Sequence, residues 1–319
     1  MFRKISLIML ALMLFMLIGG VSAIDDNATD LDGSSLSADE NLMVEGVSED
    51  GVLEASPYTI NSGNYKDYFD TNGNLVSASV KDGDTIYLEG SFSNSKFTFN
   101  RPVNIVGTST VSLKNSAVTL LNGASGSSIS GLKIANTENN MFGIFLNNAN
   151  NCVVEKCFIN NSGVASHCIA VGNDANYNNI TDNFVSCYGI TYGHGGTRST
   201  TPLIVSGSHY NTITNNYVEC DDANGIYLSS FNHDPLKGGA SNNNLIYNNT
   251  VHYNERVLVT SWANGIKVMG GNNIIDSNTV IRGFQGIYTS SGKNNTVINN
   301  RVINITGADY NHLGVEVGG

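Results

Sequence analysis

The stretch Asn242–Val251, NNNLIYNNTV, decides the fold. Half of its ten positions are asparagine, a residue that disfavours strands and is a middling helix former. Read alone, such a run is typical of a polar spacer that is prone to β-aggregation. The rest of the chain changes this interpretation, because Ile246, Asn249 and Val251 belong to a pattern that returns several times.

The pattern is an apolar residue, an asparagine three positions later, and a second apolar residue two positions after that. Five copies occur, at Ile180–Val185, Ile213–Val218, Ile246–Val251, Ile275–Val280 and Val297–Val302. Two degenerate copies precede them, at Ile129–Ile134 and Val154–Ile159. Each copy is followed by a short alternating segment that predicts a strand, namely GIFL 143–146, CIAV 168–171, LIV 203–205, GIYL 225–228, GIKV 265–268, GIYT 286–289 and GVEV 314–317.

A unit of 22–33 residues with strands this short cannot bury its own apolar face, but stacked copies can. The tight two-residue turns of antiparallel hairpins are absent between the strands. We therefore predict an all-β fold, a right-handed single-stranded parallel β-helix over 80–319 that rises by about 4.8 Å per coil. Seven coils are expected from 129 to 319, and about two more in 80–122. Segment 57–79 is predicted to form an N-terminal cap with a short helix. No cap is visible before Gly319, which favours a C-terminal truncation.

Stacking also explains the asparagines. A residue at one place in every coil meets its counterparts in the coils above and below, and side-chain amides can then donate and accept along the stack. Asparagine also tolerates the left-handed backbone of sharp corners. The sequence therefore predicts one structural column at a turn, formed by Asn183, Asn216, Asn249, Asn278 and Asn300.

The first 56 residues predict export. Arg3 and Lys4 precede an apolar run and a small-residue site ending at Ala23, so 1–23 is interpreted as a cleaved signal peptide. Segment 24–56 carries ten acidic residues and no Lys or Arg, which indicates a disordered acidic spacer. The formal charge is −11, or 14 − 27 = −13 without 1–23. This sign argues against nucleic acid and anionic membranes as partners. We expect a secreted or cell-surface location, with no membrane insertion after cleavage.

The repeat, with its wording N-x-x-N-x-V and G-I-Y-L, resembles the adhesin-like right-handed parallel β-helix proteins of methanogenic archaea, which have the pectin-lyase-like fold. The resemblance covers roughly 80–319 and includes the opening DGDTIYLEGSF. It implies a surface protein that engages glycans, either of neighbouring cells or of host or bacterial surfaces. Family members often carry a C-terminal anchoring module, which this sequence lacks.

Three insertions, at 187–201, 229–241 and 252–264, are the expected ligand-binding region, because insertions of a solenoid lie on its faces. Aromatic rings and planar donors suit sugars. The alternative is that Phe231 and Trp262 only pack the loops onto the coils. The carbohydrate-binding candidates are Tyr192, His194, Arg198, Phe231, His233, Tyr253, Arg256 and Trp262.

Enzymes with this fold include polygalacturonases, and fragments of their motifs occur at Asp221-Asp222, Gly193-His194-Gly195 and Gly265-Ile266-Lys267. The order of the fragments differs and one essential Asp is missing, so we expect a non-catalytic adhesin without a cofactor. The alternatives are a polysaccharide lyase, hydrolase or epimerase, and a purely structural wall component. The histidine spacings match no metal-ligand set, so no metal is expected.

Five cysteines are present. Cys187 and Cys220 each follow the second apolar residue of a repeat by two positions, so they should stack in adjacent coils about 4.8 Å apart. Export permits a disulfide between them. The alternative is a column of small buried thiols.

Overall fold

The computed structural model describes residues 57–188, 200–221, 223–232, 235–254, 263–305 and 314–317. The chain divides into the units Met1–Val52 and Leu53–Gly319, and every described residue belongs to the second unit. The predicted signal peptide and acidic spacer therefore lie outside the described residues. In the described ranges, no helix combines the length and the hydrophobicity that a membrane crossing requires.

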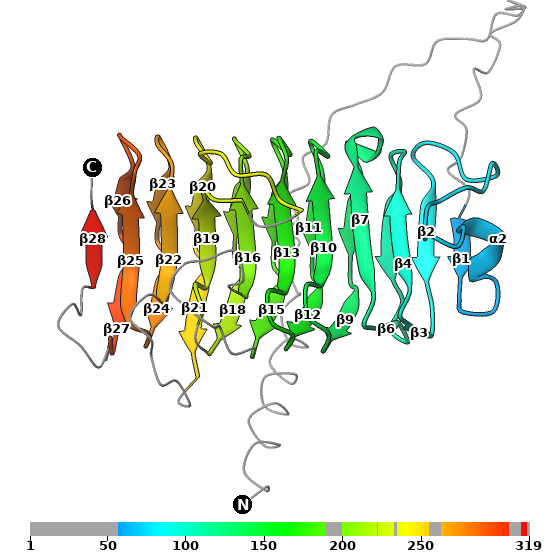
Figure 1. The fold of residues 1–319 in the computed structure, drawn as a ribbon, viewed down its shortest axis with the longest axis horizontal. Coiled ribbons are helices and arrows are strands. Elements are labelled where there is room, and N and C mark those ends of the chain that lie inside the picture. The colour runs from blue at the N-terminus through cyan, green and yellow to red at the C-terminus, as the bar shows by residue number, and fades with distance from the viewer. Residues whose placement is uncertain are drawn as a thin grey trace, which may run out of the picture. The chain divides into compact units, whose positions relative to one another are not determined.

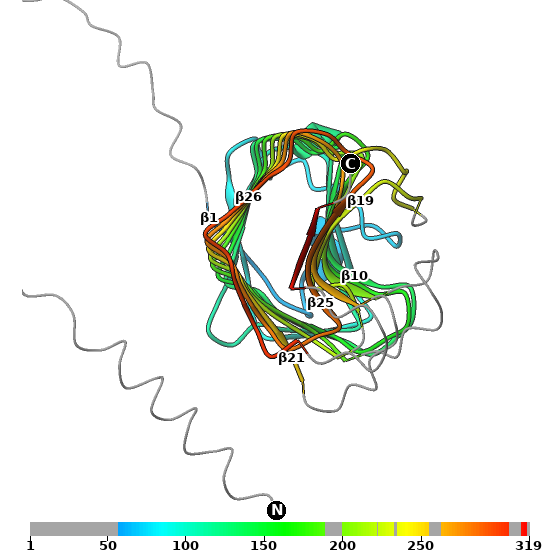
Figure 2. The same cartoon turned by 90° about the vertical axis from the view of Figure 1, so that its left-hand side faces the viewer.

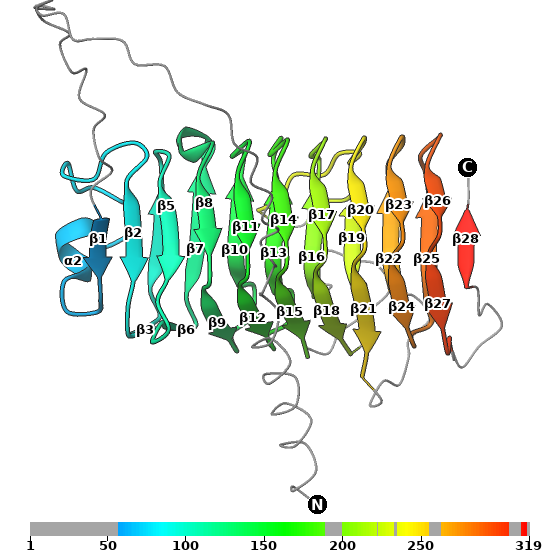
Figure 3. The same ribbon diagram turned by 180° about the vertical axis from the view of Figure 1, so that it is seen from behind.

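Three parallel sheets form the second unit (Figures 1 and 3), and each coil contributes one strand to each sheet. Sheet 1 contains β1 Pro57–Ile60, β2 Thr85–Leu88, β5 Asn104–Gly107, β8 Ser128–Ser130, β11 Val153–Glu155, β14 Asn179–Thr181, β17 Thr212–Thr214, β20 Leu245–Tyr247, β23 Ile274–Asp276 and β26 Thr296–Ile298. Sheet 2 contains β3 Ser91–Ser93, β6 Ser112–Lys114, β9 Lys133–Asn136, β12 Phe158–Asn161, β15 Phe184–Cys187, β18 Tyr217–Cys220, β21 Thr250–Tyr253, β24 Thr279–Ile281 and β27 Arg301–Ile303. Sheet 3 contains β4 Lys96–Phe99, β7 Ala117–Leu121, β10 Phe142–Asn147, β13 His167–Gly172, β16 Thr201–Ser206, β19 Ile226–Ser229, β22 Asn264–Met269, β25 Gln285–Ser290 and β28 Val315–Val317.

Viewed down the long axis, successive coils superpose and the three sheets form three sides (Figure 2). The predicted right-handed parallel β-helix is confirmed. The coils expected in 80–122 are those of β2–β7, and the seven expected from 129 onward are those of β8–β28. Each repeat thus forms one coil of three strands. The first apolar residue of the pattern lies in sheet 1, and the second lies in sheet 2.

The core is a set of apolar ladders in strict register. Ile180 pairs with Ile213, Ile213 with Ile246 and Ile246 with Ile275 along sheet 1. All four side chains are fully buried, which is the burial that a single coil could not achieve. Burial of an aliphatic side chain contributes about 1.5–3 kcal/mol, so the stacking of coils supplies most of the stability.

The glycine that opens the GI segments of sheet 3 has a packing cause. A Cβ on Gly225, Gly265 or Gly286 would lie 2.4–2.5 Å from a Cγ1 of the valine that ends a repeat in sheet 2. Only glycine lets sheets 2 and 3 approach this closely at the corner. The fragment Gly265-Ile266-Lys267 therefore owes its first residue to packing.

The N-terminal end is covered as predicted. Strand β1 pairs in parallel with β2, and the short helix α2, Tyr65–Tyr68, follows it. Tyr65 stacks on Phe69 with ring centroids 5.0 Å apart, and Phe69 meets Phe97 of the first coil edge-on at 5.3 Å. The 3₁₀ turn η2, Asn122–Ala124, is the other short helical element of the described chain.

The predicted asparagine column exists. The Nδ2 of each member donates to the Oδ1 of the next at 3.0 Å, in the order Asn183, Asn216, Asn249, Asn278, Asn300. Each of these Oδ1 atoms also accepts a backbone N–H from the preceding coil. The column therefore satisfies backbone N–H groups at the corner between sheets 1 and 2.

A second column, which we did not predict, lies at the corner between sheets 3 and 1. Its members are bonded at 3.0–3.2 Å in the order Asn178, Asn211, Asn244, Asn273, Asn295. Each precedes the first apolar residue of a repeat by two positions, so the full pattern is N-x-I-x-x-N-x-V. The residue before each column member turns left-handed, as at Asn243 with φ 57° and Asn248 with φ 53°.

The stacking of two cysteines is as predicted, because Cys187 and Cys220 pair in register in sheet 2. All five cysteines are free and buried. The Sγ of Cys187 lies 3.5 Å from that of Cys168 in sheet 3. Burial is the main reason that the pKa of Cys187 lies well above its usual value. Of the two alternatives that the sequence left open, the structure has the small buried thiols and not the disulfide.

Candidate active site

Titratable and aromatic side chains lie together on the outer face of sheet 2. The repeat determines which residues point to this face. Val185, Val218 and Val251 are fully buried, so alternate residues of β15, β18 and β21 face outward. Ser186, Glu219 and His252 are partners in one row of the sheet. Because register continues past the strand ends, Tyr188, Asp221 and Asn254 form the next outward row.

Glu219 is held by a tyrosine of the neighbouring coil. The Tyr188 hydroxyl donates to Glu219 Oε2 at 2.6 Å, a short distance that is typical of a hydrogen bond to a charged oxygen. Burial, followed by the Glu219 carboxylate, raises the pKa of Tyr188 to about 12. Tyr188 therefore stays protonated at neutral pH and donates this hydrogen bond to the Glu219 carboxyl group.

Asp221 is held in a similar way from the other side. The side-chain Nδ2 of Asn254 donates to Asp221 Oδ1 at 3.0 Å. Each carboxyl group thus has one oxygen held by a neighbouring coil, while Glu219 Oε1 and Asp221 Oδ2 have no hydrogen-bond partner among the described residues. Both carboxyl groups are only partly buried, so their free oxygens can meet a ligand.

An exposed aromatic ring lies beside the two carboxyl groups. Tyr217 is 38% exposed and precedes Glu219 by two residues on β18. It ends a stack of rings on the same face, because Phe158 stacks on Phe184 at 4.7 Å and Phe184 on Tyr217 at 5.5 Å. The next residue in register is the small Thr250, so the row of stacked rings ends at Tyr217. Its hydroxyl lies 3.5 Å from His252 Nδ1.

Glu219 and Asp221 are neighbours on the outer face of sheet 2. Glu219 lies in β18 and Asp221 directly follows the end of this strand, so an extended backbone places their Cα atoms about 6.7 Å apart with both side chains facing outward. Glycosidases that invert configuration place their two carboxyl groups about 6.5–9.5 Å apart, and retaining enzymes about 5–5.5 Å apart. Two outward side chains at this Cα spacing can take up the wider separation, which leaves room for a water molecule between a base and a bond to be cleaved.

The sequence analysis missed Glu219, because it considered Asp221 only in the fragment Asp221-Asp222, to which it assigned no catalysis. Adjacent residues of a strand point to opposite faces, so Asp221 and Asp222 were a poor pair. Counting outward by two from the buried Val218 would have found Glu219 and Asp221 on one face. Counting in the same way from Val185 and Val251 would have found Tyr188, His252 and Asn254.

Most of the predicted carbohydrate-binding residues lie outside the described residues. Of the eight, two are described. Phe231 is 47% exposed and remains a candidate. Tyr253 is 1% exposed and its hydroxyl donates to Ala223 O at 2.7 Å, so its assignment as a ligand contact is corrected. It points inward because it lies two residues after Val251. The residues outside the described ranges are Tyr192, His194, Arg198, His233, Arg256 and Trp262.

Among the described residues of the motif fragments, Lys267 is the one with an unusual environment. It is 6% exposed on sheet 3, and its Nζ lies 5.4 Å from the ring centroid of Tyr227 and 5.7 Å from that of Tyr288. Burial lowers its pKa. The two rings account for its charge by cation–π contact. Among the described residues, no group of three His, Cys, Asp or Glu side chains could hold a metal ion.

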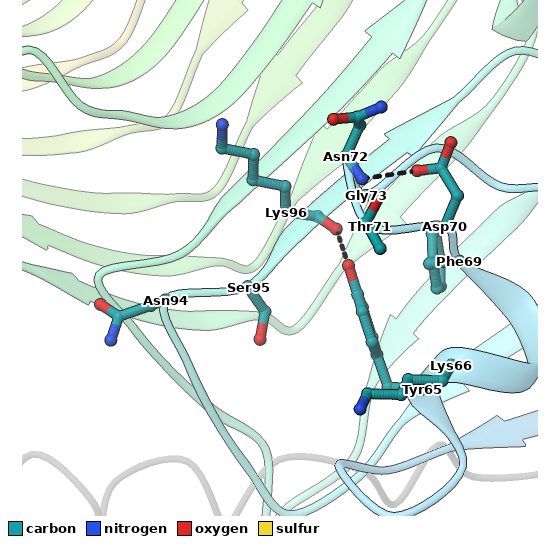
Figure 4. Close-up of a pocket in the computed structure, with 10 residues that line it drawn as sticks. All are labelled: Tyr65, Lys66, Phe69, Asp70, Thr71, Asn72, Gly73, Asn94, Ser95 and Lys96. Atoms are coloured by element: carbon teal, nitrogen blue, oxygen red, sulfur yellow. Dashed lines mark hydrogen bonds between the residues drawn. The ribbon is translucent and has the colours of Figure 1, made fainter.

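The N-terminal cap contains a cavity of about 690 Å³ (Figure 4). The Asp70 carboxylate of this cavity is already hydrogen-bonded within the cap. It accepts from the backbone N–H groups of Asn72 and Asn74 at 2.9 and 2.8 Å. The Asn74 side-chain amide, which donates to Asp70 Oδ2 at 3.0 Å, lowers the pKa of Asp70 most, and these backbone N–H groups lower it further. The Tyr65 hydroxyl donates to Lys96 O. The polar groups of this cavity close a turn and fix the cap, so we do not place the active site here.

Comparison with known proteins gives no matching family model and no matching curated protein. Solved structures do match. The chain is similar to a double-mutant tailspike protein of E. coli bacteriophage HK620 (12% identity, 83% of this chain and 59% of that chain, TM-score 0.44). It is also similar to the catalytic domain of a GH87 α-1,3-glucanase in complex with tetrasaccharides (16% identity, 74% and 64%, TM-score 0.36). A third is an alginate lyase from Paenibacillus sp. (15% identity, 81% and 98%, TM-score 0.39).

These structures contradict the prediction of a non-catalytic adhesin, because a glucanase catalytic domain and an alginate lyase are among them. That prediction is corrected, and the enzymatic alternative is the better one. The chain spans 59% of the tailspike chain and 64% of the glucanase chain. Identities of 12–16% indicate a shared fold, so the chemistry of this chain must follow from its own residues.

Proposed function

We propose that the chain is a polysaccharide hydrolase that cleaves glycosidic bonds on the outer face of sheet 2. The observation that carries the proposal is the outward pair of Glu219 in β18 and Asp221 just after its end, with the Tyr188 hydroxyl bonded to Glu219 at 2.6 Å. Inverting hydrolysis needs a base and an acid that flank one bond with room for water, and this pair supplies both.

Each carboxyl group has a distinct role. Glu219, which accepts the hydrogen bond of Tyr188, takes a proton from the water that attacks the anomeric carbon. Asp221 gives its proton to the leaving oxygen through Oδ2, the oxygen that Asn254 leaves free. After one turnover Glu219 is protonated and Asp221 is ionised, and exchange of protons with solvent restores both groups. Tyr217 offers an aromatic face to the sugar ring next to the cleaved bond.

The negative charge of the site and of the chain favours an uncharged substrate. Two carboxyl groups lie in the cluster, and the chain as a whole carries a formal charge of −11. A polyanionic glycan would be repelled by this field, whereas a neutral glycan would not. We therefore infer a neutral polysaccharide as substrate. The motif of residues 3–23 supports export, so we propose that the enzyme acts outside the cell on glycans of cell surfaces or walls.

The test is the release of reducing ends from a panel of neutral and uronic-acid polysaccharides. We expect activity on a neutral member, and losses of about 10²–10⁴-fold for Glu219→Gln and for Asp221→Asn, because each removes an acid–base group. The matched control is Glu155→Gln, an equally conservative change in sheet 1, whose only ion pair is with the neighbouring Lys156. Activity that survives both substitutions would refute the assignment, as would a uronate-only substrate range.

A further inference from the structure

A second cavity lies on the corner between sheets 3 and 1, away from the Glu219–Asp221 pair. It measures about 720 Å³. One wall consists of the turns that follow β10, β13 and β16, and the other is the segment Lys237–Ala240 of an insertion. We call it the corner pocket. Its size suits a ligand with one or two sugar rings.

The walls of the corner pocket are fixed without a ligand. Leu236 is 1% exposed and packs with Ala170, Ile204 and Tyr227 on the outer face of sheet 3. The backbone N–H of Lys237 donates to Asn173 Oδ1 at 2.7 Å, and that of Gly207 donates to Gly239 O at 3.0 Å. The insertion is therefore tied across three coils, and a ligand would meet a preformed site that loses little entropy on binding.

The side chains of the corner pocket have unused hydrogen-bonding capacity. Within the described ranges, neither the Asp174 carboxylate nor the Lys237 ammonium makes a hydrogen bond or ion pair. His209 Nδ1 accepts the backbone N–H of Asn242 at 3.1 Å, so the neutral imidazole carries its proton on Nε2. The pocket thus presents one acceptor group and two donor groups from three different coil segments.

An exposed aromatic pair borders these groups. Tyr177 and Tyr210 are 58% and 50% exposed, and their rings stack 4.9 Å apart at an interplanar angle of 4°. The Tyr210 ring meets His209 edge-on at 6.4 Å. A polar cavity beside an exposed ring is suited to a molecule with hydroxyl groups on its edges and an apolar C–H face.

We propose that the corner pocket binds a neutral saccharide. The charges of Asp174 and Lys237 cancel, so no net field favours an anion or a cation. A carboxylate accepts hydrogen bonds from sugar hydroxyl groups, while an ammonium and an imidazole N–H donate to sugar oxygens. The site would hold the saccharide independently of cleavage, because its lining shares no residue with the Glu219–Asp221 pair.

The experiment uses the full chain and two neutral disaccharides, maltose and cellobiose, with trigalacturonate as an acidic comparator. Binding is followed by chemical-shift changes in protein NMR spectra. Asp174 has φ 66°, and asparagine tolerates this backbone, so Asp174→Asn removes the charge without strain. Lys237→Met removes the donor. The control is Asp182→Asn, which has a similar left-handed backbone at φ 55° on another corner.

We expect a neutral disaccharide to shift the amide signals of Asn173, Asp174 and His209. Affinity should fall about tenfold or more in Asp174→Asn and in Lys237→Met, because a hydrogen bond to a charged group is lost. Asp182→Asn and Glu219→Gln should bind as the unchanged chain does. The proposal is overturned if neither disaccharide shifts these signals, if trigalacturonate binds more tightly, or if all variants bind equally well.

Discussion

Replacement of Asn216 by alanine tests how the columns stabilise the fold. Asn216 is 1% exposed. Its Oδ1 accepts from the backbone N–H and the Nδ2 of Asn183 at 3.1 and 3.0 Å. Its Nδ2 donates to Ile180 O, Thr214 O and Asn249 Oδ1 at 2.8–3.0 Å. The Asn183 Nδ2 keeps two other acceptors, but the Asn183 backbone N–H is left without one.

The magnitude follows from these contacts. An unsatisfied buried N–H costs about 1–3 kcal/mol, and the small cavity adds about 1 kcal/mol. We therefore expect Asn216→Ala to lower the free energy of unfolding by about 2–4 kcal/mol. The matched control is Asn300→Ala at the end of the column, where the side chain is partly exposed. Water can replace its hydrogen bonds there, so the loss should be about 1 kcal/mol.

Urea unfolding measures both variants, and a loss of this size moves the midpoint by about 1 M when m is near 2–3 kcal/mol/M. Hydrogen exchange gives a local readout, because the Asn183 amide should exchange faster in Asn216→Ala. Equal losses for Asn216→Ala and Asn300→Ala, with an unchanged Asn183 exchange rate, would refute the role assigned to the column.

Three further predictions concern the corner turns, the site tyrosine and the thiols. Asn248 has φ 53°, so Asn248→Val should cost about 1–2 kcal/mol more than Asn248→Gly in unfolding experiments; both variants lose the bond to Asn215 Oδ1, and equal costs would contradict the backbone explanation. The pKa of Tyr188 is about 12 against about 10 in an unfolded chain, so its contribution to stability is complete below about pH 10 and is lost between about pH 10 and 12. Melting temperatures should therefore fall less over this range in Tyr188→Phe, and an identical fall would contradict the bond to Glu219. A thiol reagent without reductant should titrate five cysteines after unfolding and almost none before, because burial raises the pKa of Cys157 to about 12; a count of three would indicate a disulfide.

The repeat was enough to predict the fold because each coil must place its apolar residues in the same ladders. Ile246 and Val251 point inward for this reason. Asn249 lies between them in sequence, so it must lie at the corner between sheets 1 and 2. The second column was equally visible, two positions before each first apolar residue. It was missed because the sequence analysis aligned only the asparagine between the two apolar residues of each repeat, although Asn244 is also bonded to Asn211 and Asn273.

The site was harder to predict because outward residues are free of the packing constraint. The repeat gives the face on which Glu219 and Asp221 lie, but not which outward pair has a function. Tyr188 and Glu219 lie in adjacent coils, whose repeats begin 33 residues apart. Their contact is diagonal, because Tyr188 is level with Asp221, so it can be predicted only when the register of the sheet is known. The direction of Tyr253 followed from the repeat, yet its place in an insertion suggested a ligand contact.

The most direct test of the account is ¹H NMR of the first sugar released from a neutral polysaccharide. The proposed roles of Glu219 as base and Asp221 as acid, with Cα atoms about 6.7 Å apart, predict inversion of the anomeric configuration. The signal of the inverted anomer should therefore appear first and then equilibrate, and Glu219→Gln should abolish it. A first product with retained configuration, an unsaturated sugar, or equal release by Glu219→Gln would contradict the account.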